Sequence, residues 1–282
     1  MMESRKPDSF YMANIEAMPT TFENQPQLFG SEERNLLIGS PFLKDIKEDI
    51  DDTKEDYDTL FKEIPEFRQF GLREFEETLL TISSRVFGIK VGGVKMTTMV
   101  PFMDMLNHAI PDNAYWKYRD SKKEFHCIAE EDIKRNDEVF ISYGKKGNKS
   151  LLLNYGFTTP DNNMYNQYTF RLELEASDKL YDEKVALLGA NRSHVKFKIK
   201  ADLKDMSAFL SFLRLMEFDE DIELLKLAVS NLTEIVEEKF DGKFLPFLSP
   251  RNELKVWYRV KKLAEESLVP YQTTLEEDKV LL

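Results

Sequence analysis

The hydrophobic pattern of the chain changes near residue 172, and this change constrains the fold more than any other feature. Before it, short alternating segments typical of strands are interspersed with helical stretches, whereas after it apolar residues recur at helical spacing. The sequence therefore predicts an α+β protein with a β-rich part over residues 1–172 and a helical domain over 173–282. A length of 282 residues also suits two domains.

The first part holds both helical and strand signals. Helical periodicity predicts one acidic amphipathic helix over 31–65, which Pro65 ends, and another helix over 74–87. The pair Gly92-Gly93 lies between β-branched residues and predicts a hairpin or turn. Three segments have the character of short strands: 114–119, 124–130 and 138–143, the last after an Asn136-Asp137 turn.

The apolar spacing of the second part predicts helices throughout. Three apolar stripes predict three helices: Leu203, Met206, Leu210 and Leu213 after an Asp202 N-cap; Ile222, Leu225, Val229, Leu232 and Val236; and Leu254, Trp257 and Leu268. Thr274 and Glu277 have the spacing of a capping box and predict the start of a fourth helix.

Composition excludes several classes of function. A single cysteine and three widely separated histidines disfavour a metal centre. The net charge of −12 disfavours direct binding to nucleic acid and makes a basic protein the better electrostatic partner. The sequence has no apolar run of membrane-spanning length and no signal-peptide pattern at its start. An intracellular protein, cytoplasmic or nuclear, is the expectation.

Two segments, 101–109 and 138–157, carry most of the polar and aromatic residues suited to chemistry. Taken alone, Asn107-His108 is more often a buried hydrogen-bonded pair, and the Tyr-Gly pairs at 143 and 155 could be strand ends that pack their rings. Taken together, Asp-x-x-Asn-His, then Tyr-Gly-x-x-x-Asn and Tyr-Gly-Phe, resemble the SET-domain protein methyltransferases of the Rubisco large-subunit methyltransferase class. Members of this class modify lysine in non-histone proteins and, in one branch, histidine in actin.

The resemblance extends over nearly the whole chain. Residues 18–42 are similar to the insert region of that class, 84–87 match its Ser-Arg-x-Phe element, and 251–282 are similar to its helical substrate-binding domain. The resemblance therefore implies a β-rich SET domain with a helical insert at about 18–87, followed by an all-α substrate-binding domain. It also implies S-adenosylmethionine as cofactor, a protein as substrate, and no metal.

The matching motif positions imply a role for each site residue. Tyr143 matches the catalytic tyrosine, whose phenolic oxygen lies beside the transferred methyl and the accepting amine. The other positions match substrate-channel residues, Ser84, Phe87 and Tyr155, and cofactor contacts, Arg85, Asp104, Asn107, His108 and Phe157. A lysine acceptor has a free pKa near 10.4, so it must lose its proton and its water before it attacks, and a narrow aromatic channel would desolvate and align it.

One departure from the family pattern leaves the activity open. The Gly-x-Gly segment with which the family's SET domain begins has no match here, so the chain is expected to lack the N-terminal part of that domain. Three explanations remain: a truncated sequence of an active enzyme, a catalytically degenerate member that serves as a structural or interaction subunit, or an active enzyme completed by an unusual N-terminus or a partner. Weak cofactor binding by these residues alone is expected. Lysine is preferred over histidine as the target because Tyr155-Gly156-Phe157 keeps the channel tyrosine.

Overall fold

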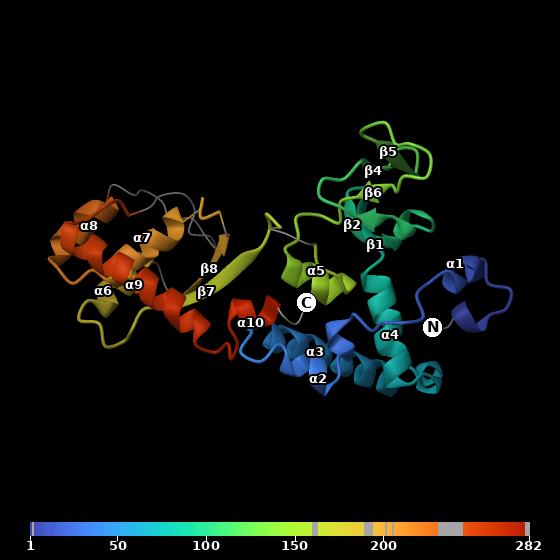
Figure 1. Cartoon of the computed structure of the whole chain (residues 1–282), viewed down its shortest axis with the longest axis horizontal. Helices are drawn as coiled ribbons and strands as arrows, with labels where there is room; N and C mark the ends of the chain where they lie inside the picture. The colour runs from blue at the N-terminus through green and yellow to red at the C-terminus, as the bar shows by residue number, and fades with distance from the viewer. Residues whose placement is uncertain are drawn as a thin grey trace. The chain divides into compact units, whose positions relative to one another are not determined.

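The computed structural model describes residues 1, 3–159, 163–188, 194–200, 202–204, 206–230 and 245–279. The chain divides into two compact units, Met1–Tyr165 and Asn166–Leu282 (Figure 1). Helices and strands occur in both units, which confirms the predicted α+β class.

Unit 1 begins with a largely helical stretch. Its elements are η1 (Glu3–Arg5), α1 (Met12–Glu16), η2 (Pro26–Leu28), α2 (Ser31–Asn35), α3 (Phe42–Glu63), η3 (Pro65–Gln69) and α4 (Leu72–Ser83). The prediction of one helix over 31–65 is wrong, because Gly39 takes a positive φ of 86° and interrupts the chain between α2 and α3. The expected stop is confirmed: α3 ends at Glu63, and Pro65 starts a 3-10 helix.

The second predicted helix, over 74–87, ends earlier than expected. The Ser83 hydroxyl donates to the Leu80 carbonyl and the Ser84 hydroxyl to the Thr81 carbonyl, contacts that compete with continued helical hydrogen bonding. The chain then turns into strand β1 (Val86–Val91). Arg85 therefore lies between a helix and a strand rather than within the helix.

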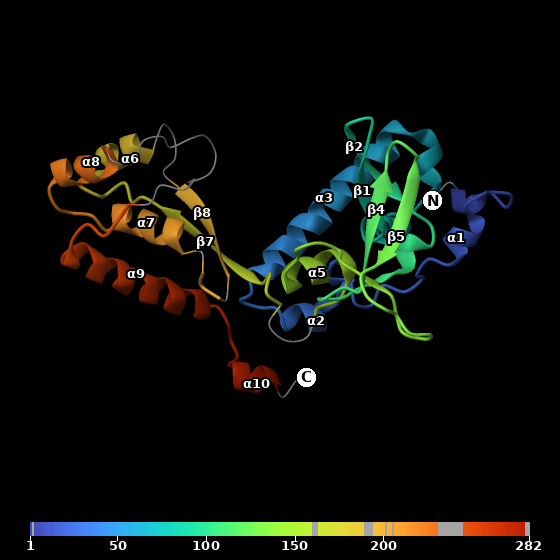
Figure 2. The same ribbon diagram turned by 90° about the horizontal axis from the view of Figure 1, so that it is seen from above.

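The remaining strands of unit 1 pair with close neighbours in the sequence, with one exception. The pairs are β1 with β2 (Val94–Met99), β4 (Ala114–Arg119) with β5 (Glu124–Ala129), both antiparallel, and β3 (Asn107–His108) with β6 (Phe140–Ile141), which is parallel. Figure 2 shows β4 and β5 side by side. Gly92 and Gly93 both have positive φ, as a two-residue hairpin turn requires, so the predicted hairpin is confirmed.

The short parallel pair of β3 and β6 joins the two motif segments, 101–109 and 138–157. Only two residues of the predicted 138–143 strand pair, with Asn107 opposite Phe140 and His108 opposite Ile141. Around this pair a small core forms from buried Phe87, Met103, Ala114 and Ile141, with Trp116 and Phe125 packed against it. The motif segments are thus held together by a hydrophobic cluster rather than by a wide sheet.

Helix α5 (Asn148–Tyr155) of unit 1 ends at Gly156, which has a left-handed φ of 75°. A Cβ atom built on Gly156 would lie 3.0 Å from Gln25 Nε2 and 3.3 Å from the Asn24 carbonyl oxygen. Glycine is needed here both for its φ and for the close approach of the Asn24 backbone and the Gln25 side chain.

Gly156→Ala should therefore lower the free energy of unfolding of unit 1 by about 2 kcal/mol, because it adds left-handed strain to a steric clash. The matched control is Gly88→Ala, where a new Cβ meets nothing within 4 Å. Denaturant titration of both variants measures the difference. An equal effect at the two positions would contradict the close approach.

Unit 2 contains a two-stranded antiparallel sheet as well as helices. Its elements are β7 (Gln167–Glu173), α6 (Tyr181–Leu188), β8 (His194–Lys200), α7 (Ser207–Met216), α8 (Ile222–Ser230), α9 (Pro250–Leu268) and α10 (Leu275–Lys279). The expectation of an entirely helical second domain is therefore incorrect. In β8, Val195, Phe197 and Ile199 alternate with lysines, which is a strand pattern, and the strand pairs antiparallel with β7.

The start of α7 differs from the expected one. Asp202 accepts a hydrogen bond from the Lys204 backbone within a turn, and Leu203 has a positive φ of 54°, so the helix begins at Ser207 instead of after an Asp202 cap. The next predicted stripe is seen in part: Ile222 and Leu225 lie on α8, while Leu232 and Val236 fall outside the described residues. The capping box is confirmed, because Thr274 N donates to Glu277 and Glu277 N donates to Thr274 Oγ1.

Helix α9 faces the core with a different stripe from the predicted one. Leu254 and Trp257 are 74% and 51% exposed, and Leu268 is also exposed. The core side carries Val256, which is fully buried, followed by Val260 and Leu263. Apolar residues lie on more than one face of this helix, so helical spacing alone could not select the buried one.

Candidate active site

A cavity of about 330 Å³ lies in unit 1 where the end of α4, β1, η4 (Met103–Met105), β6 and α5 meet. Six of the predicted site residues line it: Ser84, Arg85, Phe87, Asp104, Tyr143 and Tyr155. Asn107, His108 and Phe157 lie beside this group without lining the cavity. A volume of this size falls at the lower end of small-molecule sites.

Tyr143 lies at the centre of the site. It lies two residues after the end of β6, and its hydroxyl donates a 2.7 Å hydrogen bond to the Leu106 carbonyl, one residue before β3. Burial raises the pKa of Tyr143, and the nearby Arg85 charge offsets only part of this effect. Tyr143 therefore remains a neutral phenol around neutral pH and can present its oxygen without a charge.

Three other rings surround Tyr143. Its ring centroid lies 4.8 Å from that of Tyr155, 5.2 Å from the stacked His108 ring and 6.3 Å from Phe157. Burial also raises the pKa of Tyr155. The group forms an aromatic wall suited to excluding water from a reacting nitrogen.

Arg85 and Asp104 put opposite charges on the cavity. The Arg85 guanidinium donates to the Asp104 backbone carbonyl at 2.8 Å, and its Nε atom is buried without a partner. Both Asp104 carboxylate oxygens are buried and make no hydrogen bond of good geometry in the described part of the chain. Burial raises the pKa of Asp104, and the Arg85 charge lowers it by less. These unpaired buried atoms have hydrogen-bonding capacity left for a ligand.

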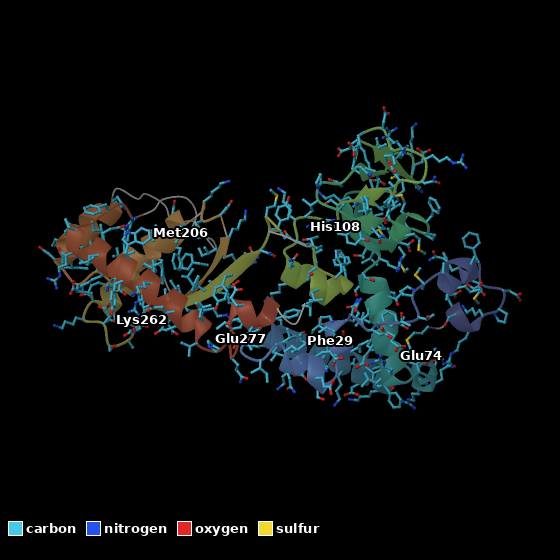
Figure 3. The ribbon with its side chains drawn as sticks, in the orientation of Figure 1. Phe29, Glu74, His108, Met206, Lys262 and Glu277 are labelled. Atoms are coloured by element: carbon cyan, nitrogen blue, oxygen red, sulfur yellow. The ribbon has the colours of Figure 1, made fainter. Side chains whose placement is uncertain are left out.

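Asn107 and His108 hold the strand pair together. Asn107 Nδ2 donates to Glu138 Oε1 at 2.6 Å, and this side chain is exposed. His108 Nδ1 lies 3.2 Å from both the Tyr143 amide nitrogen and the Ile141 carbonyl oxygen, so the ring fixes the backbone that leads into Tyr143. His108 Nε2 is buried without a partner among the described residues. Figure 3 labels His108 within unit 1.

Ser84 and Phe87 line the cavity in different ways. The Ser84 hydroxyl donates a hydrogen bond to the Thr81 carbonyl. Phe87 is 8% exposed and contacts the rings of Trp116 and Phe125 edge-on, so it belongs to the core cluster as well as to the cavity wall.

Sequence reasoning did not single out two residues that the structure brings to this site. Lys146 lines the cavity, and Glu138 binds Asn107 through its carboxylate and Asn113 through its carbonyl. Both lie inside the segment 138–157, so their position within that segment could have indicated that they belong to the site. Asn148, the asparagine of the Tyr-Gly-x-x-x-Asn pattern, forms hydrogen bonds with Thr159 and Asn163, which fix the chain beyond α5.

The described residues show neither the pattern of a metal centre nor that of a membrane-spanning helix. No group of three or more His, Cys, Asp and Glu side chains gathers there as metal ligands would. None of the described helices is both long and apolar enough to cross a membrane.

Asp104→Asn should stabilise the fold in a pH-dependent way. Because the native pKa of Asp104 is raised, the folded protein holds this proton more tightly than the unfolded chain, so its stability falls as pH rises above the ordinary carboxyl value of 3.8. The gain from Asp104→Asn should be near zero below that value and greatest at neutral pH. Thermal unfolding across a pH series measures it, with Asp58→Asn on exposed α3 as the control for net charge. A gain that is constant with pH would contradict the burial of the carboxylate.

Comparisons with known proteins find two family models that match the chain. A SET domain model matches residues 17–144, and a Rubisco LSMT substrate-binding model matches residues 175–282. The actin-histidine N-methyltransferases of Mus musculus and Xenopus tropicalis are 26% and 25% identical to the chain, in each case over its full length. The chain spans about half the length of these curated relatives.

Two solved structures give a similar result. The SET domain of LSMT bound to lysine and AdoHcy has a TM-score of 0.75 and 23% identity, and Rubisco LSMT bound to sinefungin and monomethyllysine has a TM-score of 0.73 and 25% identity. Each comparison covers 99% of this chain, with 65% of the first solved chain and 64% of the second. The fold of the chain is that of these proteins.

Proposed function

We propose that this chain, which matches a SET domain model and a Rubisco LSMT substrate-binding model, transfers a methyl group from S-adenosylmethionine to a side-chain nitrogen of a protein. The observation that carries the proposal is the cavity in which Tyr143 and Tyr155 face the opposite charges of Arg85 and Asp104. A structural or interaction subunit does not require buried charged atoms left without partners beside an aromatic wall.

The charged end of the cavity fits the cofactor. The amino-acid part of S-adenosylmethionine carries one ammonium and one carboxylate, and the unpaired atoms of Asp104 and Arg85 have the complementary charges. Asn107, His108 and Phe157 are proposed to hold the rest of the cofactor from the adjoining strand pair. When bound, the cofactor supplies an activated methyl group on a sulfonium.

The aromatic end of the cavity is proposed to receive the acceptor nitrogen. Tyr143 presents a neutral phenolic oxygen whose proton is already donated to Leu106, so a lone pair remains for the acceptor. Tyr155 and Phe87 exclude water, and Ser84 lies at the edge of the same wall. Alignment of this kind can contribute roughly 7–11 kcal/mol to a bimolecular reaction.

Lysine is the acceptor that we propose, because the paired Tyr143 and Tyr155 rings suit a long aliphatic chain with a cationic end. Histidine is the second candidate, and the similarity of the whole of this chain to about half of the actin-histidine N-methyltransferases favours it. The two differ in pH dependence, because free lysine titrates near 10.4 and free histidine near 6.5.

The test is transfer of labelled methyl from S-adenosylmethionine to matched peptides that contain either lysine or histidine. For lysine, kcat/KM should still rise with pH through the alkaline range, whereas for histidine it should level off above about 6.5. Cofactor binding without transfer to protein, to either peptide or to any lysine of the chain would favour the alternative of a degenerate interaction subunit.

We also propose a basic protein surface as the partner. The net charge is −12, and α3 alone carries nine acidic residues against four lysines. Association should weaken as salt shortens the Debye length from about 10 Å at 0.1 M to about 3 Å at 1 M. Measuring affinity for candidate substrates at low and high ionic strength checks this, and a partner held equally well in high salt would contradict it.

A further inference from the structure

Three lysines follow Tyr143 within a few residues, and they differ in what they contact. Lys145 is exposed and does not line the cavity. Lys149 pairs with Asp45 on α3 at 2.5 Å. Lys146, between them, lines the cavity together with Tyr143 and Tyr155.

The Lys146 ammonium rests on the aromatic wall. Its Nζ atom lies 5.7 Å from the centroid of the Tyr155 ring, within the range of a cation–π contact. Among the described residues, no carboxylate forms an ion pair with Lys146 (none within 4.0 Å) that would draw it away from the ring. The side chain is therefore held at the place where an acceptor amine would enter.

The backbone of Lys146 is fixed while its side chain extends into the cavity. Its N–H donates to the Gly144 carbonyl at 2.8 Å, and its own carbonyl accepts from Asn163 Nδ2 at 3.0 Å. Gly144, with a φ of 102°, forms the bend between Tyr143 and this loop. A fixed loop keeps the amine at high effective concentration near the reaction centre.

We propose that Lys146 is itself a methyl acceptor, so that the chain methylates a lysine that lines its own cavity beside Tyr143 and Tyr155. This inference rests on the proposed function. Lys146 first loses a proton to solvent and becomes a neutral amine. Its nitrogen lone pair then forms the C–N bond as the methyl–sulfur bond breaks. That bond's electron pair stays on sulfur, which leaves S-adenosylhomocysteine and a methylated, positively charged lysine.

The modification has a consequence for the substrate. Methylation keeps the positive charge and adds bulk, and methylated ammonium groups bind aromatic faces well. A methylated Lys146 would therefore remain on Tyr155 and narrow the entrance that a substrate side chain has to use. Self-modification should slow the later methylation of added peptide.

The experiment incubates the full chain with labelled S-adenosylmethionine and locates the label by peptide mass spectrometry. Wild type, Lys145→Arg and Lys149→Arg should each gain one methyl mass at Lys146, whereas Lys146→Arg should show only background at that peptide. The fraction modified at a fixed time should not depend on protein concentration, because the reaction is intramolecular. A lysine peptide added in parallel reports methyl transfer itself.

The outcomes separate this inference from the proposed function. Methylation of the added peptide without label on Lys146 would overturn the inference and leave the function standing. Label spread evenly over exposed lysines, or a modified fraction that grows with protein concentration, would also overturn it. Absence of label from both the peptide and the chain would overturn the inference together with the function.

Discussion

Tyr143→Phe should reduce methyl transfer by roughly 10²–10³-fold while the protein stays folded, an effect of the size seen when a catalytic hydrogen-bonding group is removed. The hydroxyl is the polar group that the proposed reaction centre uses, and in the free protein it donates a hydrogen bond to the Leu106 carbonyl. Loss of that bond should cost only about 1 kcal/mol of stability. Cofactor affinity, measured by calorimetric titration, should change much less than the rate.

Tyr57→Phe is the matched control. The Tyr57 hydroxyl also donates to a backbone carbonyl, that of Phe70 at 2.9 Å, and it is partly buried in the helical insert away from the cavity. The two variants should lose similar stability, but only Tyr143→Phe should lose activity. Wild-type turnover in Tyr143→Phe, or an equal loss in Tyr57→Phe, would contradict the role given to Tyr143.

Lys184→Met should lower the free energy of unfolding of unit 2 by about 3 kcal/mol. Lys184 is fully buried on α6, and its ammonium donates to Asp178 at 2.5 Å and to the carbonyl of Met216, the last residue of α7, at 2.9 Å. Methionine has a similar length but leaves the carboxylate and the carbonyl without this donor. Asp178 is partly exposed, so water recovers some of the loss.

Lys226→Met serves as the comparison in the same unit. Lys226 pairs with Glu223 at 2.8 Å, but both side chains are more than half exposed, and such pairs contribute at most about 1 kcal/mol. Denaturant unfolding followed by a probe in unit 2 measures both variants. A small effect for Lys184→Met would mean that the hydrogen bond from the buried Lys184 ammonium to the Met216 carbonyl does not hold α6 against α7.

The sequence predicted local features better than it predicted which face of an element is buried. The Gly92-Gly93 hairpin and the Thr274–Glu277 capping box depend on residues adjacent in the chain, so their chemistry is visible in the sequence. The β7–β8 pairing joins strands separated by α6, and helical spacing on α9 fits more than one face. Those outcomes depend on tertiary packing that periodicity does not encode.

The candidate site shows the same limit. Motif order indicated which residues to collect, and the structure places six of them around one cavity. Motif order could not indicate that the Asp104 carboxylate finds no hydrogen-bond partner within the described part of the chain, or that Lys146 turns toward Tyr155, because both depend on how the loops fold over each other. The protonation behaviour of the site is thus a property of packing rather than of residue identity.

The parallel pair β3–β6 also has a kinetic consequence. His108 and Ile141 meet although they are 33 positions apart, so the site forms only after a long stretch of chain has closed on itself. The β4–β5 hairpin lies inside that stretch, and once formed it shortens the loop to roughly half, which lowers the closure cost by about 0.6 kcal/mol. Substitutions that weaken the hairpin register, such as at Trp116 opposite Cys127, should delay recovery of cofactor binding during refolding more than recovery of the helices.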